Sequence, residues 1–193
     1  MEEKIKEKLK ELVKPKRYEH SLLVANEAKK LAEIYNESEE KAYLTGLAHD
    51  IAKNFDYEEN KKWIKKYGLD EKWLKRENEK LVHAEVGALV AKEYFNFDDE
   101  MCRAIKYHTI GNEIMTNFEK IIFIADKIGR KELDEDTIKI KDMAYKDIDK
   151  AMLLFLTYQE KKFTTKGKEL HPETKKLVKK LEIAIKFTRK KSN

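Results

Sequence analysis

Apolar residues recur at three- and four-residue steps along most of the chain, which places them on one face of an α-helix. The pattern is clearest after His20, where Leu23, Val24, Ala28 and Leu31 follow at this spacing. Only 2 Pro and 6 Gly interrupt the 193 residues, so few positions break a helix. We therefore predict an all-α fold.

Helix start and stop signals divide this pattern into segments. Ser38 and Asp98 are N-cap residues, Asp56 with Glu59 forms a capping-box pattern, and Gly111 is a helix stop. Polar residues at 131–142 predict a loop. We expect helices over residues 2–13, 16–35, 38–53, 56–68, 70–77, 83–94, 98–108, from 117 through 126, 143–162, and from 172 onward.

Composition limits the chain to one soluble domain. A length of 193 residues suits one domain, 1–193, and 41% charged with 41% hydrophobic residues suits amphipathic helices. The single cysteine, Cys102, forms no intrachain disulfide, and the amino terminus has no apolar signal segment, so we expect a cytoplasmic protein. The longest apolar runs, such as 152–156, are far shorter than a membrane span.

Charge does not point to nucleic acid. The formal net charge is +5, from 42 basic and 37 acidic residues, which describes a mixed surface. The densest basic stretch, 175–191, is interleaved with Leu177, Leu181, Ile185 and Phe187, which predicts a packed terminal helix with a solvated face. We expect neither a nucleic-acid partner nor a membrane partner.

One carboxylate stands in an unusually apolar setting. Asp126 ends the run IIFIAD at residues 121–126. Carboxylates are rarely buried unless a charge partner, a hydrogen-bond network or a metal offsets the loss of hydration. Asp126 therefore predicts a positive partner inside the fold.

Four of the five histidines also fall among apolar residues at helical spacing, and each alone is more often structural than a ligand. They are His20, His49, His83 and His108, and Asp50 follows His49 directly. Adjacent side chains of a helix diverge by about 100°, so His49 and Asp50 can both reach an ion that lies at the edge of the helix. Together with Asp126 the set has six ligands, more than one four-coordinate zinc takes. It favours two metals, or one six-coordinate iron or manganese ion with some histidines facing substrate.

Several short motifs then carry a family resemblance. They are KRYEHSL (16–22), GLAHDIAK (46–53), HAEVGA (83–88), AIKYHTIG (104–111), IADKI (124–128) and LHPET (170–174). In this order they resemble the YqeK family of HD-domain metal-dependent phosphohydrolases, whose members are symmetrical dinucleoside tetraphosphate hydrolases. The resemblance implies an HD-domain helical bundle built around a buried metal site. The segment after Asp126 is shorter than the family pattern.

The resemblance also implies roles for individual residues. His20, His49, Asp50 and Asp126 would hold the main iron-type site, while His83 and His108 would complete a second site or bind phosphate. Lys53 would be either a snorkelling helix-end lysine or a phosphate contact. The catalytic candidates are Asp50, Lys53 and Asp126, and the substrate-binding candidates are Arg17, His83, His108, Thr109, Arg130, His171 and Thr174.

The implied reaction is metal-dependent hydrolysis of a phosphoric anhydride, with diadenosine tetraphosphate giving two ADP by attack of an activated water. Iron is the expected cofactor, although manganese, cobalt or zinc also accept these ligands. The nucleotide substrate and the nucleoside diphosphate product are the expected partners, and a homodimer is allowed. The alternatives are another HD-domain nucleotide phosphohydrolase or a non-catalytic nucleotide-binding sensor.

Overall fold

The computed structural model describes the backbone of residues 1–191 and the side chains of residues 1–187, and its regular elements there are all helical. This confirms the predicted all-α class. The side chains of 188–191, at the end of the predicted basic helix, lie outside the described part. The α-helices are α1 (Glu2–Leu12), α2 (Pro15–Ile34), α3 (Glu39–Ala48), α4 (Tyr57–Lys66), α5 (Val82–Phe95), α6 (Asp99–Tyr107), α7 (Asn117–Ile128), α8 (Glu135–Ala144), α9 (Ile148–Thr164) and α10 (Pro172–Lys191).

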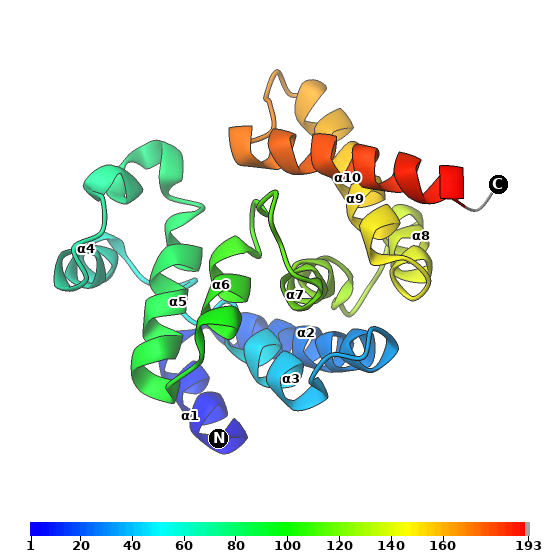
Figure 1. Ribbon diagram of the computed structural model, residues 1–193. Coiled ribbons are helices and arrows are strands. Elements are labelled where there is room, and N and C mark those ends of the chain that lie inside the picture. Colours follow the sequence, from blue (N-terminus) through cyan, green and yellow to red (C-terminus); the bar gives the residue numbers. More distant parts are fainter. Residues whose placement is uncertain (192–193) are drawn as a thin grey trace.

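Helix α7 lies at the centre of the fold. It contacts α2, α3 and α6 as well as α8 and α9, and Figure 1 shows it between the α2–α3 pair and the α8–α10 group. Its residues Ile121, Ile122, Phe123, Ile124 and Ala125 are all fully buried. A helix that is apolar on every side is stable only inside a core. The apolar run before Asp126 therefore carries that carboxylate into the interior.

Most of the predicted helix starts are correct. Ser38 accepts from the amide of Lys41, and the capping box of Asp56 and Glu59 is complete. The start of α7 differs from the prediction, because Thr116 is the N-cap and Asn117 is the first helical residue. Thr116 was the better cap since Glu119 lies three residues later and completes a second capping box.

The prediction of a loop at 131–142 is wrong. Helix α8 begins within this stretch at Glu135 and continues to Ala144, and the following helix α9 begins at Ile148 rather than near residue 143. Asp134 caps α8 by accepting from the amide of Thr137, and the helix buries Ile140 and Ala144. Because only these two residues are buried, most of α8 is polar. Its apolar residues are therefore too few to show helical spacing in the sequence.

The third predicted helix is shorter than expected. Helix α3 ends at Ala48 instead of continuing to Lys53, and the chain then tightens into three-residue turns, with Lys53 N donating to Asp50 O at 2.9 Å. The segment from Asp70 is also irregular, since it forms two short 3₁₀ helices, Glu71–Leu74 and Arg76–Asn78. These two 3₁₀ helices lie between α4 and α5.

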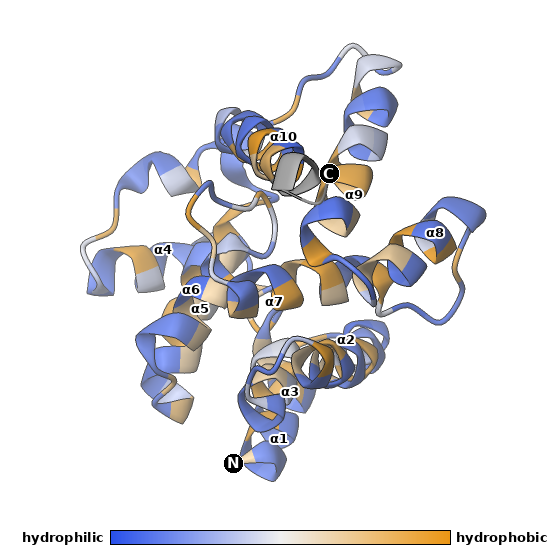
Figure 2. Cartoon of the chain, turned by 45° about the vertical axis from the view of Figure 1, so that its right-hand side comes forward, coloured by the Kyte–Doolittle hydropathy of each residue, from blue (hydrophilic) through white to orange (hydrophobic). Residues whose placement is uncertain are grey.

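Most helices carry hydrophilic residues along one side and hydrophobic residues along the other (Figure 2). Trp63 and Trp73 are partly buried and pack against the main core. Among the residues that the structure describes, none of the helices combines the length and the apolar character needed to cross a membrane.

Candidate metal centre

Close packing of α2 against α3 brings the first two histidines together. A Cβ atom on Gly46 of α3 would lie 2.9 Å from the Cα atom of Ala25 in α2, so only glycine allows this approach. His20 lies near the start of α2 and His49 directly follows α3. Their ring centroids are 5.3 Å apart. The helix contact therefore places both imidazoles on one side of the centre.

Two histidines are oriented by the same kind of hydrogen bond to a backbone carbonyl. His49 and His108 are the C-cap residues of α3 and α6, and each Nδ1 lies 2.6 Å from the carbonyl oxygen three residues earlier. A carbonyl only accepts, so Nδ1 carries the proton and donates it. Each Nε2 atom then carries the lone pair of the neutral ring, as in histidines that bind metals.

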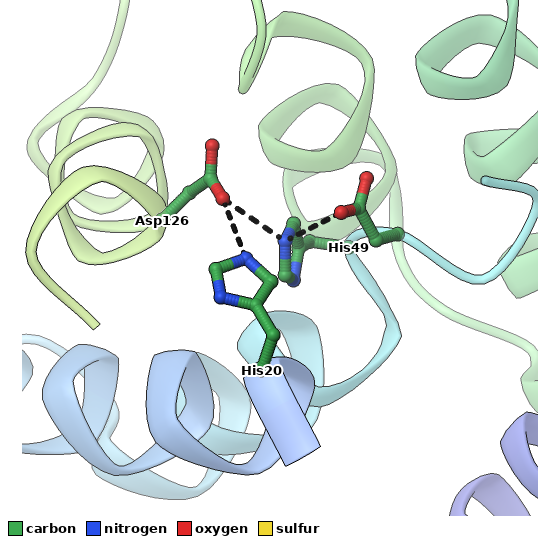
Figure 3. A group of neighbouring side chains, drawn as sticks. His20, His49 and Asp126 are labelled. Atoms are coloured by element: carbon green, nitrogen blue, oxygen red, sulfur yellow. Dashed lines mark hydrogen bonds and ion pairs between the residues drawn. The ribbon is translucent and has the colours of Figure 1, made fainter. Parts of the chain in front are cut away.

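The first group of ligands consists of His20, His49, Asp50 and Asp126, whose candidate donor atoms all lie within 4.8 Å of one another. Oδ1 of Asp126 lies 2.9 Å from Nε2 of His20 and 3.3 Å from Nε2 of His49. Figure 3 shows the His20 and His49 rings and the Asp126 carboxylate pointing toward one another from separate segments. The structure thus brings the four predicted residues to one point.

A second group shares Asp50 with the first. It consists of Asp50, His83 and His108. Oδ1 of Asp50 lies 3.1 Å from Nε2 of His83 and 3.5 Å from Nε2 of His108, and the two Nε2 atoms are 3.3 Å apart. All three side chains are buried. The carboxylate of Asp50 therefore lies between two clusters of imidazole nitrogen.

Both groups contain buried polar atoms that the protein does not satisfy. Nε2 of His49 and Oδ1 of Asp50 have no hydrogen-bond partner within the described part of the chain. Such atoms are costly to bury, because they lose water and gain nothing in return. A divalent cation satisfies lone pairs on imidazole and carboxylate together, so the donor set fits a metal.

The electrostatics of the two groups differ. Burial lowers the pKa of His49, but the carboxylates of Asp50 and Asp126 outweigh it and raise the pKa to about 9. Burial lowers the pKa of His83 to about 4 and also lowers the pKa of His108. The second group, with one carboxylate for two rings, therefore keeps its imidazoles neutral, which is the form that ligates metals.

A cavity of about 850 Å³ opens over the first group. We call it the basic cavity. Its wall contains side chains of Lys14, Lys16, Arg17, Glu19, His20, Leu23, Asp50, Lys53, Asn54, His108, Thr109, Asp126, Lys127, Arg130, Lys131 and Glu132. Seven of these side chains are lysine or arginine, so a polyanion is the complementary ligand.

Three cations contact the ligand carboxylates directly. Nη1 of Arg17 donates to Oδ2 of Asp50 at 2.7 Å, and Nζ of Lys53 lies 3.7 Å from Oδ1. Nζ of Lys127 donates to Oδ2 of Asp126 at 2.6 Å and to the backbone oxygen of His108 at 3.1 Å. Sequence reasoning did not select Lys127, although its position next to a buried carboxylate was a usable signal.

The other predicted substrate contacts divide into two pairs. Thr109 and Arg130 line the basic cavity, whereas His171 and Thr174 do not. The hydroxyl of Thr174 donates to the carbonyl of Ile110 at 2.7 Å, and Nδ1 of His171 accepts from the amide of residue 173. The Thr174 bond holds the start of α10 against the segment after α6, and the His171 bond is local to the helix start.

Residues 17–131 match the HD domain. The chain belongs to the HD domain family. The matched region contains all six predicted ligands and both ligand groups. The HD domain thus accounts for the bundle of α2 to α7 and for the candidate metal centre within it.

Relatives extend the similarity beyond this region. A symmetrical bis(5'-nucleosyl)-tetraphosphatase of Staphylococcus aureus is 38% identical over 167 residues, covering 82% of this chain and 86% of that protein. One of the same name from Halalkalibacterium halodurans is 31% identical, covering 85% and 90%. A crystal structure from Clostridium acetobutylicum, described as a predicted HD superfamily hydrolase involved in NAD metabolism, has a TM-score of 0.87 at 33% identity and covers 95% of this chain and 98% of that one. These relatives confirm the predicted family and fold.

Proposed function

We propose that this HD domain protein hydrolyses dinucleoside tetraphosphates symmetrically, giving two nucleoside diphosphates. The observation that carries the proposal is the pair of ligand groups sharing Asp50 beside a cavity with seven basic side chains. The names of the relatives from Staphylococcus aureus and Halalkalibacterium halodurans support the same reaction. A tetraphosphate chain carries the negative charge that this cavity complements.

We assign His20, His49, Asp50 and Asp126 to one ion and Asp50, His83 and His108 to a second. Neutral, buried imidazoles suit a metal better than a phosphate, which pairs with cations. The low pKa of His83, caused by burial, therefore favours the second ion over a phosphate contact. A transition metal bound here would lower the pKa of a coordinated water and polarise phosphoryl oxygens.

The remaining residues would position and neutralise the substrate. Arg17 and Lys53 contact Asp50 and also line the basic cavity, so they lie where a phosphate chain meets the metal centre. Lys127 holds Asp126 through its second oxygen. Thr109 and Arg130 also line the cavity, with the Thr109 hydroxyl 3.3 Å from Nε2 of His108, and we assign them to further phosphate contacts. Charge neutralisation of this kind is the main protein contribution to phosphoryl transfer.

Iron is the metal we propose, because mixed imidazole and carboxylate ligands with open positions suit it, while manganese, cobalt and zinc accept the same donors. Elemental analysis of anaerobically purified protein tests this assignment. The expected result is iron in the purified chain and restored activity on adding iron to stripped protein. Activity with zinc alone would replace the iron assignment.

The reaction balances with one water per substrate. Water attacks one of the two central phosphorus atoms, the bridging P–O bond breaks, and the leaving diphosphate takes up the proton. Oxygen-18 water should therefore label one of the two ADP molecules from each diadenosine tetraphosphate. Chromatography at early times should show ADP without AMP or ATP. Appearance of AMP and ATP would overturn symmetrical cleavage.

A further inference from the structure

A second cavity of about 340 Å³ lies beside the metal centre, and its wall is unusually aromatic. We call it the aromatic cavity. It is formed by the start of α4, the 3₁₀ segment and the residue that begins α5. Its lining side chains are Phe55, Asp56, Tyr57, Asn60, Trp73, Leu74, Arg76, Glu79 and Val82. The volume falls at the lower end of the range of small-ligand sites.

The cavity wall also contains a buried polar atom without a partner. Asn60 is 6% exposed, and its Nδ2 donates to the carbonyls of Phe55 and Asp56 at 3.2 and 2.8 Å. Both of those neighbours only accept, so the NH₂ group must face them and the amide orientation is fixed. Oδ1 has no hydrogen-bond partner within the described residues. The wall of the cavity therefore includes a residue with a buried, unpaired acceptor.

The aromatic cavity adjoins the residues assigned to catalysis. Phe55 follows Lys53 by two residues, and Val82 directly precedes His83. Nζ of Lys53 lies 2.9 Å from Nε2 of His83, so chain neighbours of Phe55 and Val82 contact each other at the metal centre. Two residues of chain span at most about 7 Å. The segment 53–55 therefore connects the wall of the basic cavity, which contains Lys53, to the wall of the aromatic cavity, which contains Phe55.

From this placement we infer that the aromatic cavity binds the nucleobase of one half of the dinucleotide substrate. The inference rests on the proposed function and adds a site for one base. Trp73 and Tyr57 provide faces on which a base can stack, and Asn60 lies in the same wall. Arg76 supplies a cation for the adjoining phosphate. The tetraphosphate then extends from this cavity across the metal centre into the basic cavity.

Tryptophan fluorescence tests the site without requiring turnover. The chain has 2 Trp, and Trp63 is outside the cavity wall, stacked on Tyr67 with centroids 5.8 Å apart. Metal-loaded Trp63→Phe protein leaves Trp73 as the reporter, and Trp73→Phe leaves Trp63. We expect ADP to quench the first protein and leave the second unchanged, with pyrophosphate quenching neither. Equal quenching of both, none in either, or quenching by pyrophosphate alone would overturn the inference.

Kinetics provide the second test. Trp73→Leu should raise KM for diadenosine tetraphosphate about tenfold, the loss expected from removing one base–aromatic stack, with kcat and metal content unchanged. Trp63→Leu is the matched control and should leave KM unchanged. Tyr57→Ser, at a side chain 55% exposed, gives the same test if Trp73→Leu fails to fold. An unchanged KM in the folded variants contradicts the inference.

The two hypotheses fail separately. If the wild-type protein hydrolyses no dinucleoside tetraphosphate, the proposed function fails, and the ADP titration alone then decides whether the aromatic cavity binds a base. If the wild-type protein is active but ADP does not quench Trp73, only the base site is lost.

Discussion

Two buried carboxylates show how differently this protein treats its acidic groups. Glu27 of α2 is 7% exposed, and each of its oxygens accepts a hydrogen bond at 2.7 Å, one from Lys141 and one from Tyr145. Asp50 is 1% exposed, and although Oδ2 accepts from Arg17, Oδ1 has no hydrogen-bond partner in the described part of the chain.

The difference separates a structural carboxylate from one placed for a ligand. A buried acidic group whose oxygens are all paired links two elements, here α2 and α8, and needs nothing further. An oxygen without a hydrogen bond, close to imidazole nitrogens, leaves a desolvation cost that a bound metal ion reduces. Asp50 and Glu27 can therefore be tested as opposite cases with the same measurements of metal content, activity and stability.

Asp50→Ala should have the largest effect, because Asp50 belongs to both ligand groups. We expect the protein to lose both ions and its activity to fall by more than the roughly 100-fold that loss of a supporting contact costs. Elemental analysis and the hydrolysis assay measure this. Asp142→Ala, on the exposed side of α8, is the control and should be normal. Full metal occupancy in Asp50→Ala would contradict the assignment.

Asp50→Ala should also lose the stabilisation that metal binding gives to the folded protein. Metal that binds the folded chain raises its stability by about 4 kcal/mol at a thousandfold excess over Kd. Adding metal to stripped wild type should therefore raise the thermal midpoint, and adding it to Asp50→Ala should not. A shift of equal size in both proteins would mean that the metal binds elsewhere.

His83→Ala should have the next largest effect and should separate the two groups. The first group does not contain His83, so about one of two ions should remain, with activity falling about 10- to 100-fold. For metal content, His171→Ala is the matched control, because His171 lies outside both groups. If His83→Ala loses all metal, the groups do not bind independently.

Lys53→Met should leave the metal and weaken the reaction. Lys53 lines the basic cavity and contacts Asp50 without belonging to the ligand set. We expect kcat/KM to fall about 10-fold or more, since a buried charge partner of a phosphate is worth about 1.5–3 kcal/mol. Lys62→Met, on the exposed side of α4, should match wild type. Normal kinetics in Lys53→Met would contradict a phosphate contact at this residue.

The sequence brought together the six candidate ligands because polar, titratable residues at apolar positions stand out in a single chain. The sequence did not reveal the distinction between Asp50 and Glu27. The hydrogen-bond partners of Glu27 lie more than a hundred positions away along the chain. Helix α8, which supplies those partners, was predicted as a loop because it buries only Ile140 and Ala144.

The aromatic cavity was hidden for a related reason. Trp63 and Trp73 have the same spacing signals as core residues, and both do pack against the core. Only the fold shows that Trp73 also lines a cavity, with Phe55 and Asn60 from a separate segment. A cavity is a property of several segments together, so local periodicity does not reveal it.

Glu27→Gln should have the smallest effect and should fall on stability alone. Burial raises the pKa of Glu27, but Lys141 and Tyr145 outweigh it and hold the pKa below its ordinary value of 4.5. A lowered pKa means that the ionised group stabilises the fold above pH 4.5, and that this contribution is lost as pH falls through the folded pKa. Losing the charged bond should lower the free energy of unfolding by about 1–2 kcal/mol at pH 7.

Urea denaturation of both proteins from pH 7 to pH 3 measures this difference, and it should shrink as the pH falls below 4.5 because wild-type Glu27 becomes protonated. Glu33→Gln, on the exposed side of α2, is the control and should differ little from wild type at any pH. Metal content and kcat should stay unchanged in Glu27→Gln. Loss of metal in this variant would show that the α2–α8 contact supports the centre, and the separation between the two carboxylates would then not hold.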